Sequence, residues 1–186
     1  MVSVCYLSQD YYLSRYIIEN MLKNSGGVEL ELLVSVKDKR LSDFLSELIK
    51  SKKYSNLMFV KFTENQNGYQ ELIKEAKGKY ICLYDDQALV NQNWLMDLVY
   101  YNSNIQNSGL SFIHSGIKGK FIPLLSVEDD FINIWEIKEP TGVCLFSESL
   151  KLPNEINVKS IYESFLKQGL QNFYIPNQIC IKLKTN

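Results

Sequence analysis

Short apolar runs alternate with amphipathic segments through the first half of this chain. Residues 2–7 (VSVCYL) are followed by apolar residues at helical spacing from Leu13 to Leu22, and residues 29–36 (ELELLVSV) by a second helical pattern. Two more pairs follow, with strand-like runs at residues 56–62 and 79–84 and helical patterns at residues 69–76 and 94–99. This strand–helix–strand order predicts an α/β fold, with a mainly parallel, doubly wound sheet and helices on both faces.

Capping residues and glycines mark where the helices begin and end. Asp10 stands at a helix N-cap position, and Gly26 and Gly27 end the first helix. The second half is less regular, with a helix predicted at residues 158–167, ended by Gly169, and strands at residues 110–114, 131–137, 142–146, 173–175 and 179–183. No linker separates the two halves, so we predict a single domain over residues 1–186.

The charge balance argues against some partners. The chain has 186 residues, with 20 Lys and Arg against 21 Asp and Glu, which gives a net charge of -1. A broad basic surface for nucleic acid is therefore not expected. No run of 18 or more apolar residues occurs, so we predict no transmembrane segment.

The four cysteines and the amino terminus bear on the compartment. Each cysteine lies within an apolar run and none forms a CxxC pair, so buried, reduced thiols are expected rather than a zinc site. No basic region precedes an apolar stretch at the start, as it would in a signal peptide. Together these features predict a cytoplasmic protein.

In a parallel sheet the ligand binds beyond the carboxyl ends of the strands, so polar residues that follow strands are the candidates. They are Ser8, Gln9 and Asp10 after the first strand, Lys37 and Asp38 after the second, and Asp85, Asp86 and Gln87 after the fourth. Adjacent carboxylates there suit Mg²⁺ or Mn²⁺, which would neutralise a diphosphate leaving group. The alternative is that these acids only favour the amino end of the next helix. The residues alone leave both interpretations open.

The stretch GKYICLYDDQALVNQNWL (residues 78–95) carries a resemblance to a known family. With EAK before it, it resembles the Ala-x-Gly, Tyr-Ile, apolar strand, acidic DxD-type motif and Trp-Leu helix of family 2 glycosyltransferases, which have the GT-A fold. The opening VSVCYLS, the run TGVCLFSESL and the closing SIYESFLKQGLQNFYIP are also similar to that family in order and spacing.

The resemblance implies a GT-A-type, Rossmann-like domain that transfers a sugar from a nucleotide-diphosphate donor to an acceptor hydroxyl on a glycan, lipid or protein. Residues 1–104 would bind the nucleotide sugar and residues 105–186 would face the acceptor. Asp85 and Asp86 would hold donor and metal (Mn²⁺ or Mg²⁺). Ser8, or its backbone, would meet a uracil edge, with Asp38 nearby as the acid closest to the end of the second strand.

The sequence also departs from the family pattern. Gln87 stands where the last Asp of DxD is expected, and Asn157 and Val158 stand where the family has a Glu-Asp pair that includes the general base. Glu155 is the nearest substitute for that base. The chain is also shorter than the usual catalytic domain, which is consistent with a small acceptor, a missing partner domain or chain, or lost function.

Two other classes of protein stay open. One is a non-catalytic GT-A-like module that binds a nucleotide, a glycan or a protein partner, which the three departures would explain. The other is a different nucleotide-binding α/β protein, such as a nucleotidyltransferase or an oxidoreductase. No GxGxxG motif follows the first strand, which argues against a dinucleotide cofactor.

Overall fold

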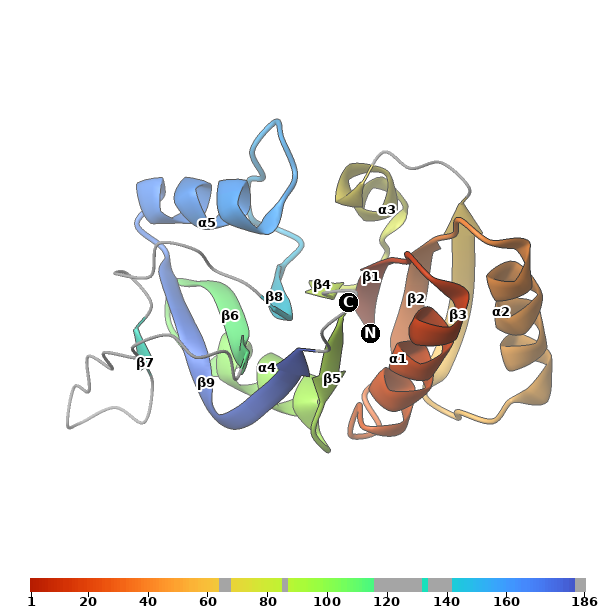
Figure 1. Cartoon of the computed structure of the whole chain (residues 1–186). Coiled ribbons are helices and arrows are strands. Elements are labelled where there is room, and N and C mark those ends of the chain that lie inside the picture. The colour runs from red at the N-terminus through yellow and green to blue at the C-terminus, as the bar shows by residue number, and fades with distance from the viewer. Residues whose placement is uncertain (64–67, 85–86, 116–131, 134–141, 183–186) are drawn as a thin grey trace.

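The computed structural model describes residues 1–63, 68–84, 87–115, 132–133 and 142–182 (Figure 1). Within these ranges only the backbone is described for residues 114–115, 132–133 and 176–182. The strands are β1 (Val2–Leu7), β2 (Leu30–Ser35), β3 (Leu57–Thr63), β4 (Tyr80–Tyr84), β5 (Ala88–Val90), β6 (Ser108–Ser115), β7 (Ile132–Asn133), β8 (Cys144–Ser147) and β9 (Gln171–Lys182). The helices are α1 (Tyr11–Lys23), α2 (Lys39–Ser51), α3 (Tyr69–Glu75), α4 (Trp94–Asn104) and α5 (Val158–Lys167).

One mixed sheet runs through the described chain in the order β3-β2-β1-β4-β8-β6-β9-β5, with β7 paired to β9. The first four strands in this order are all parallel. Strand β8 is antiparallel to both β4 and β6, whereas β9 is parallel to β6 and antiparallel to β5. The predicted α/β fold with a mainly parallel sheet is thus confirmed.

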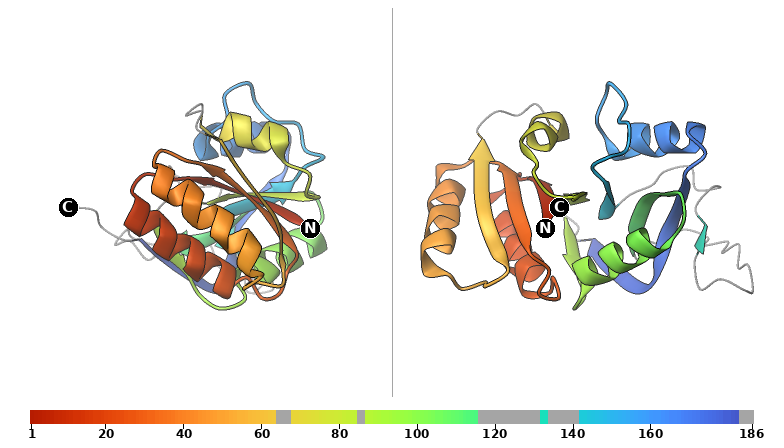
Figure 2. Two further views of the ribbon diagram at one scale, coloured as in Figure 1. Left: turned by 90° about the vertical axis from the view of Figure 1, so that its right-hand side faces the viewer. Right: turned by 180° about the vertical axis from the view of Figure 1, so that it is seen from behind.

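Helices cover both faces of the sheet because alternate strand residues point to opposite sides. Val4 and Tyr6 of β1 belong to the core under α1, α2 and α4, whereas Cys5 belongs to the core under α3 and α5. Figure 2 shows α1 and α2 side by side on one side of the sheet and α3 on the other. The near-continuous burial of β1 and β2 follows from this double cover.

The structure contains the capping residue and the glycines that were predicted at the ends of α1 and α5. The Asp10 carboxylate accepts hydrogen bonds from the backbone N–H groups of Tyr12 and Leu13, at 2.9 and 3.0 Å. After α1, Gly26 and Gly27 both have φ of 75°, and Gly169 after α5 has φ of 74°. These left-handed conformations favour glycine, which explains why these helices end where they do.

Two strands differ from the sequence prediction. The sequence does not predict β5, because three residues are too few to show a periodic pattern. The strand is held in place by its pairing with β9 and by Asn20, whose Oδ1 accepts a hydrogen bond from the Val90 N–H at 2.9 Å. Residues 171–182 form one strand rather than two. Pro176, which suggests a break, falls where the β6–β9 register shifts between Phe112 and His114.

Three of the four cysteines are free and fully buried, as predicted: Cys5, Cys82 and Cys144. Burial raises the pKa of each thiol, and raises the pKa of Cys144 to about 12. The side chain of Cys180 lies outside the described residues. In the part of the chain that the structure describes, no helix is both long and apolar enough to cross a membrane.

A buried hydrogen-bonded brace joins three strands at their amino ends. The Ser3 hydroxyl donates to Glu31 Oε1 at 2.5 Å, and the Lys77 N–H donates to the same oxygen at 2.6 Å. The Gly78 N–H donates to Ser3 Oγ at 2.7 Å. A Cβ on Gly78 would lie 2.5 Å from the backbone nitrogen of Ser3, so the approach of the chain to β1 requires glycine.

Gly78→Ala is therefore expected to destabilise the fold by about 1–3 kcal/mol, the usual cost of overpacking a buried contact. The φ of Gly78 is outside the left-handed region, so the loss would report the steric contact rather than backbone strain. Urea unfolding followed by circular dichroism measures it. Lys77→Ala, which keeps the backbone N–H at an exposed neighbouring position, is the control. Equal midpoints for the two variants would contradict the role given to this contact.

Candidate functional site

The carboxyl ends of the four parallel strands line one edge of the sheet. In the register, Leu7 of β1 pairs with Ser35 of β2, Ser35 pairs with Thr63 of β3, and Tyr6 pairs with Tyr84 of β4. Ser8 and Asp38 thus follow neighbouring strands at this edge. Asp85 and Asp86, which come directly after Tyr84, lie outside the described residues.

Ser8 is buried, with 2% of its surface exposed, at the end of β1. Its backbone N–H and its hydroxyl both donate to the carbonyl of Ser35, at 3.1 and 2.5 Å. The hydroxyl proton is therefore used to fasten β1 to β2. What Ser8 can offer a ligand is the acceptor capacity of its oxygen.

Asp38 is the N-cap residue of α2, and its carboxylate accepts from the backbone N–H of Arg40 at 2.8 Å. The guanidinium of Arg40 also binds it, with Nη2 at 2.5 Å from Oδ2. The Arg40 side chain, and then its backbone N–H, lower the pKa of Asp38. Asp38 is thus an ionised, partly exposed carboxylate that already has a cationic partner.

An aromatic group around Arg40 was not predicted from the sequence. The guanidinium lies 4.9 Å from the ring centroid of Tyr11 and 5.5 Å from that of Tyr12. The two rings meet edge to face, with centroids 5.1 Å apart, and Tyr12 is 69% exposed. This group stands at the amino ends of α1 and α2, beside the strand edge. The two successive tyrosines were the only signal in the sequence that pointed to it.

Tyr84 and Tyr69 form hydrogen bonds with the described residues on either side of Asp85 and Asp86. The Tyr84 hydroxyl donates to the carbonyl of Ala88 at 2.9 Å, and the Tyr69 hydroxyl donates to the carbonyl of Tyr84 at 2.9 Å. The Tyr84 ring is fully buried between Tyr6 and Trp94, at centroid distances of 6.1 and 5.3 Å. Sequence reasoning missed both hydroxyls because their partners are backbone groups that no residue pattern reveals.

Glu155 is exposed, and its hydrogen bonds with other described residues are local. Its Oε1 accepts from Asn157 Nδ2 at 2.9 Å, and its carbonyl accepts from the Ser160 hydroxyl at 2.6 Å. Asn157 is the N-cap of α5 and forms a capping box with Ser160. No contact joins Glu155 to Ser8 or Asp38 among the described residues. Asn157 thus has a structural role at the position where the resemblance implies an acid.

Within the described residues, no group of three or more His, Cys, Asp or Glu side chains lies close enough to hold a metal ion. Asp85 and Asp86 lie outside these residues. The donors in this stretch, which are the two carboxylates and the amide oxygen of Gln87, are all oxygens, as Mg²⁺ and Mn²⁺ prefer. Gln87 is half-buried and directly precedes β5.

No protein-family model and no curated protein sequence matches the chain, but solved structures do. S. aureus TarS 1–349 has a TM-score of 0.63 at 12% identity, over 97% of this chain and 60% of that chain. TarS 1–349 in complex with UDP-GlcNAc has a TM-score of 0.62 at 15% identity, over 100% of this chain and 59% of that chain. The Pyrobaculum calidifontis mannosyltransferase PcManGT, in complex with GDP-Man and Mn²⁺, has a TM-score of 0.64 at 9% identity. The match covers 97% of this chain and 56% of that chain. The chain has a glycosyltransferase-like fold.

Identities of 9% to 15% establish the fold and say nothing of individual site residues. The chain spans less than two thirds of the length of each of these structures, between 56% and 60%. The roles of Ser8, Asp38, Asp85, Asp86 and Glu155 in a glycosyltransferase-like site therefore stay predictions.

The ion pair of Asp38 leads to a pH-dependent prediction. Because folding lowers the pKa of Asp38, its charge stabilises the folded state above the ordinary carboxyl value of about 3.9, and this stabilisation disappears as the pH falls through the lowered value. Asn also caps helices, so Asp38→Asn removes the charge and keeps the cap. We expect a lower melting temperature for Asp38→Asn at pH 7 in low salt, and no difference from the wild type at pH 2.

Asp43→Asn is the matched control, since Asp43 is exposed on the same helix and forms no ion pair with a described residue. Thermal melts of the three proteins across this pH range measure the effect. Parallel curves for Asp38→Asn and Asp43→Asn would show that the Arg40 contact adds nothing beyond net charge.

Proposed function

We propose that this chain is a glycosyltransferase domain that transfers a sugar from a nucleotide-diphosphate donor to an acceptor hydroxyl. The observation that carries the proposal is the combination of a glycosyltransferase-like fold with two adjacent carboxylates, Asp85 and Asp86, directly after the central strand β4. The likeness of GKYICLYDDQALVNQNWL to family 2 glycosyltransferases supports the same assignment.

In this proposal each candidate residue has a role that its chemistry permits. Asp85 and Asp86 hold the donor and a divalent cation, and the bound cation supplies positive charge opposite the diphosphate leaving group. Ser8 accepts a hydrogen bond from the nucleobase edge, and Asp38 lies near the nucleoside. The acceptor is a hydroxyl of a glycan, a lipid or a protein.

The reaction is a displacement at the anomeric carbon. The acceptor oxygen forms a bond to that carbon while the bond from the carbon to the diphosphate oxygen breaks, and the nucleoside diphosphate leaves with the electron pair. A base must take the proton of the attacking hydroxyl. Glu155, an exposed carboxylate before α5, is the proposed base.

Nucleotide titration tests the donor site. We expect UDP or GDP to bind more tightly with Mn²⁺ than without it, and Asp85→Asn/Asp86→Asn to weaken the Mn²⁺-dependent binding by about tenfold or more, which corresponds to about 1.4 kcal/mol. Isothermal calorimetry measures both. Glu148→Gln is the control and should bind nucleotide like the wild type. It removes an exposed carboxylate near the start of β4, where the Glu148 backbone N–H donates to the Lys79 carbonyl. Failure of both nucleotides to bind the wild type would refute the proposed donor site.

The hydroxyl of Tyr84 offers a subtler test of the same site. Tyr84→Phe keeps the buried ring but removes the hydrogen bond from the end of β4 to the Ala88 carbonyl at the start of β5. We expect weaker nucleotide binding with Mn²⁺, by about threefold to tenfold, because the start of β5 would be held less firmly beside β4 and ordering it on binding costs free energy. Tyr101→Phe on α4 is the control. Unchanged affinity for Tyr84→Phe would mean that this bond does not position the site.

A second candidate function is a non-catalytic module of the same fold. The use of Asn157 as a helix cap, at the position where the resemblance implies an acid, favours it. Radiolabelled UDP-GlcNAc and GDP-Man, incubated with Mn²⁺ and wild type or Glu155→Gln, distinguish the two. Hydrolysis or transfer that depends on Glu155 supports the enzyme. Nucleotide binding without turnover supports the module.

A further inference from the structure

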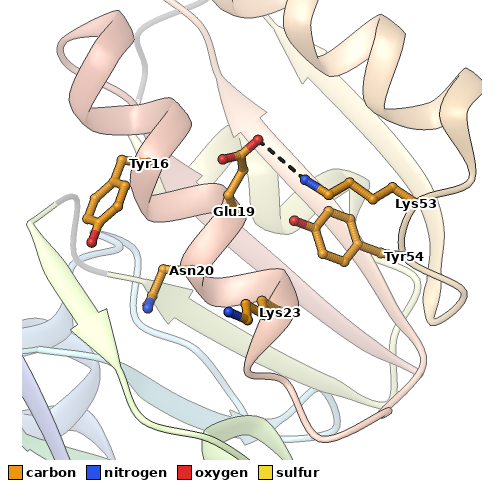
Figure 3. Close-up of a pocket in the computed structure, with 6 residues that line it drawn as sticks. All are labelled: Tyr16, Glu19, Asn20, Lys23, Lys53 and Tyr54. Atoms are coloured by element: carbon orange, nitrogen blue, oxygen red, sulfur yellow. Dashed lines mark ion pairs between the residues drawn. The ribbon is translucent and has the colours of Figure 1, made fainter.

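A hollow lies away from the strand edge, between the carboxyl half of α1 and the chain that follows α2. It is open to solvent and has a volume of about 530 Å³, and Figure 3 shows the six side chains that line it: Tyr16, Glu19, Asn20, Lys23, Lys53 and Tyr54. Small-molecule sites in proteins occupy roughly 300–1,000 Å³. The hollow is therefore large enough for more than one sugar ring.

Two aromatic rings border this hollow from different elements. Tyr16 of α1 is 57% exposed and makes no ring contact or hydrogen bond with a described residue. Tyr54 packs against the main core on one side, and Lys53 Nζ lies 5.2 Å from its ring centroid. In Figure 3 the rings stand on either side of Glu19. One exposed tyrosine is ordinary on a protein surface, but a free ring beside a hollow with polar walls suits a ligand with an apolar face.

The polar groups of the hollow include both acceptors and donors. Glu19 Oε1 lies 3.7 Å from Lys53 Nζ and 3.9 Å from Arg15 Nε, so the carboxylate is held in place while 34% of its side chain stays exposed. Asn20 Oδ1 accepts from the Val90 N–H at 2.9 Å, which fixes the amide. Lys23 forms no ion pair with any described residue. The walls thus present a fixed carboxylate, a fixed amide and two ammonium groups.

We propose that this hollow is a binding site for an oligosaccharide. A sugar ring has an apolar face of C–H groups, which stacks on a tyrosine, and a rim of hydroxyls that both donate and accept hydrogen bonds. Glu19 accepts from such hydroxyls, and Asn20 and the lysines donate to them. A purely apolar ligand would bury these polar groups without partners, and a polyphosphate would meet the carboxylate of Glu19.

The site is separate from the proposed donor site. Helix α1 begins after the carboxyl end of β1, and its 13 residues span about 20 Å, so its last turn lies toward the opposite edge of the sheet. Lys23 is in that last turn. The proposal does not depend on sugar transfer by this chain, because a saccharide can dock here whether or not a donor binds at the strand edge.

Titration of ¹⁵N-labelled protein with chitotriose, maltotriose and cellotriose, each followed by NMR, tests the site. We expect at least one trisaccharide to shift the amide signals of Asn20, Lys23 and Tyr54 at millimolar concentration. Tyr16→Ala should weaken this binding by about tenfold, and Glu19→Gln should weaken it as well. Tyr100→Ala removes a tyrosine that is 61% exposed on α4 and should leave binding unchanged.

The outcomes separate this site from the donor site. Saccharide binding should be unaffected by Asp85→Asn/Asp86→Asn, and UDP binding with Mn²⁺ should be unaffected by Tyr16→Ala. The proposal is overturned if none of the three trisaccharides binds. It is also overturned if they bind equally well to Tyr16→Ala and Glu19→Gln, or if the aspartate variant abolishes their binding.

Discussion

The buried brace of Glu31, Ser3 and the Lys77–Gly78 backbone sets the position of the central strands. It joins β2, β1 and the entry to β4 at their amino ends, through three hydrogen bonds of 2.5 to 2.7 Å. Parallel strands rise by about 3.3 Å per residue, so fixing where they start also fixes where they end. The candidate residues at the carboxyl edge thus depend on contacts at the opposite edge of the sheet.

The brace also explains why an acid is tolerated inside the sheet. Glu31 is 3% exposed, and a buried carboxylate is costly unless donors surround it. The Ser3 hydroxyl and the Lys77 N–H are such donors, and they are correctly placed only in the observed register. Sliding β4 by one residue would break these bonds and turn Tyr84 to the wrong face. The polar network therefore contributes to register specificity more than to net stability.

The parts of the fold that the sequence predicts are those governed by local rules. Periodicity and caps such as Asp10 locate four strand–helix units, whereas β5 depends on Val90 pairing with Cys180, far along the chain. The same distinction between local and long-range interactions applies to the candidate site. Chain order suffices to put Ser8 at a strand end, but its bond to the Ser35 carbonyl involves a residue 27 positions away. Hydrogen bonds between residues so far apart in the sequence produce no periodic pattern from which they could be predicted.

At the position of Asp38, helix capping and ligand binding compete for the same carboxylate. Helices begin where parallel strands end, so a residue that faces a ligand at this edge is also well placed to cap a helix. The Asp38 carboxylate has about four acceptor positions and already receives the N–H, Nε and Nη2 of Arg40. A nucleoside that approaches Asp38 must share the carboxylate with Arg40 or displace it. Tyr11 and Tyr12, whose rings lie against the guanidinium, would then determine where Arg40 can move.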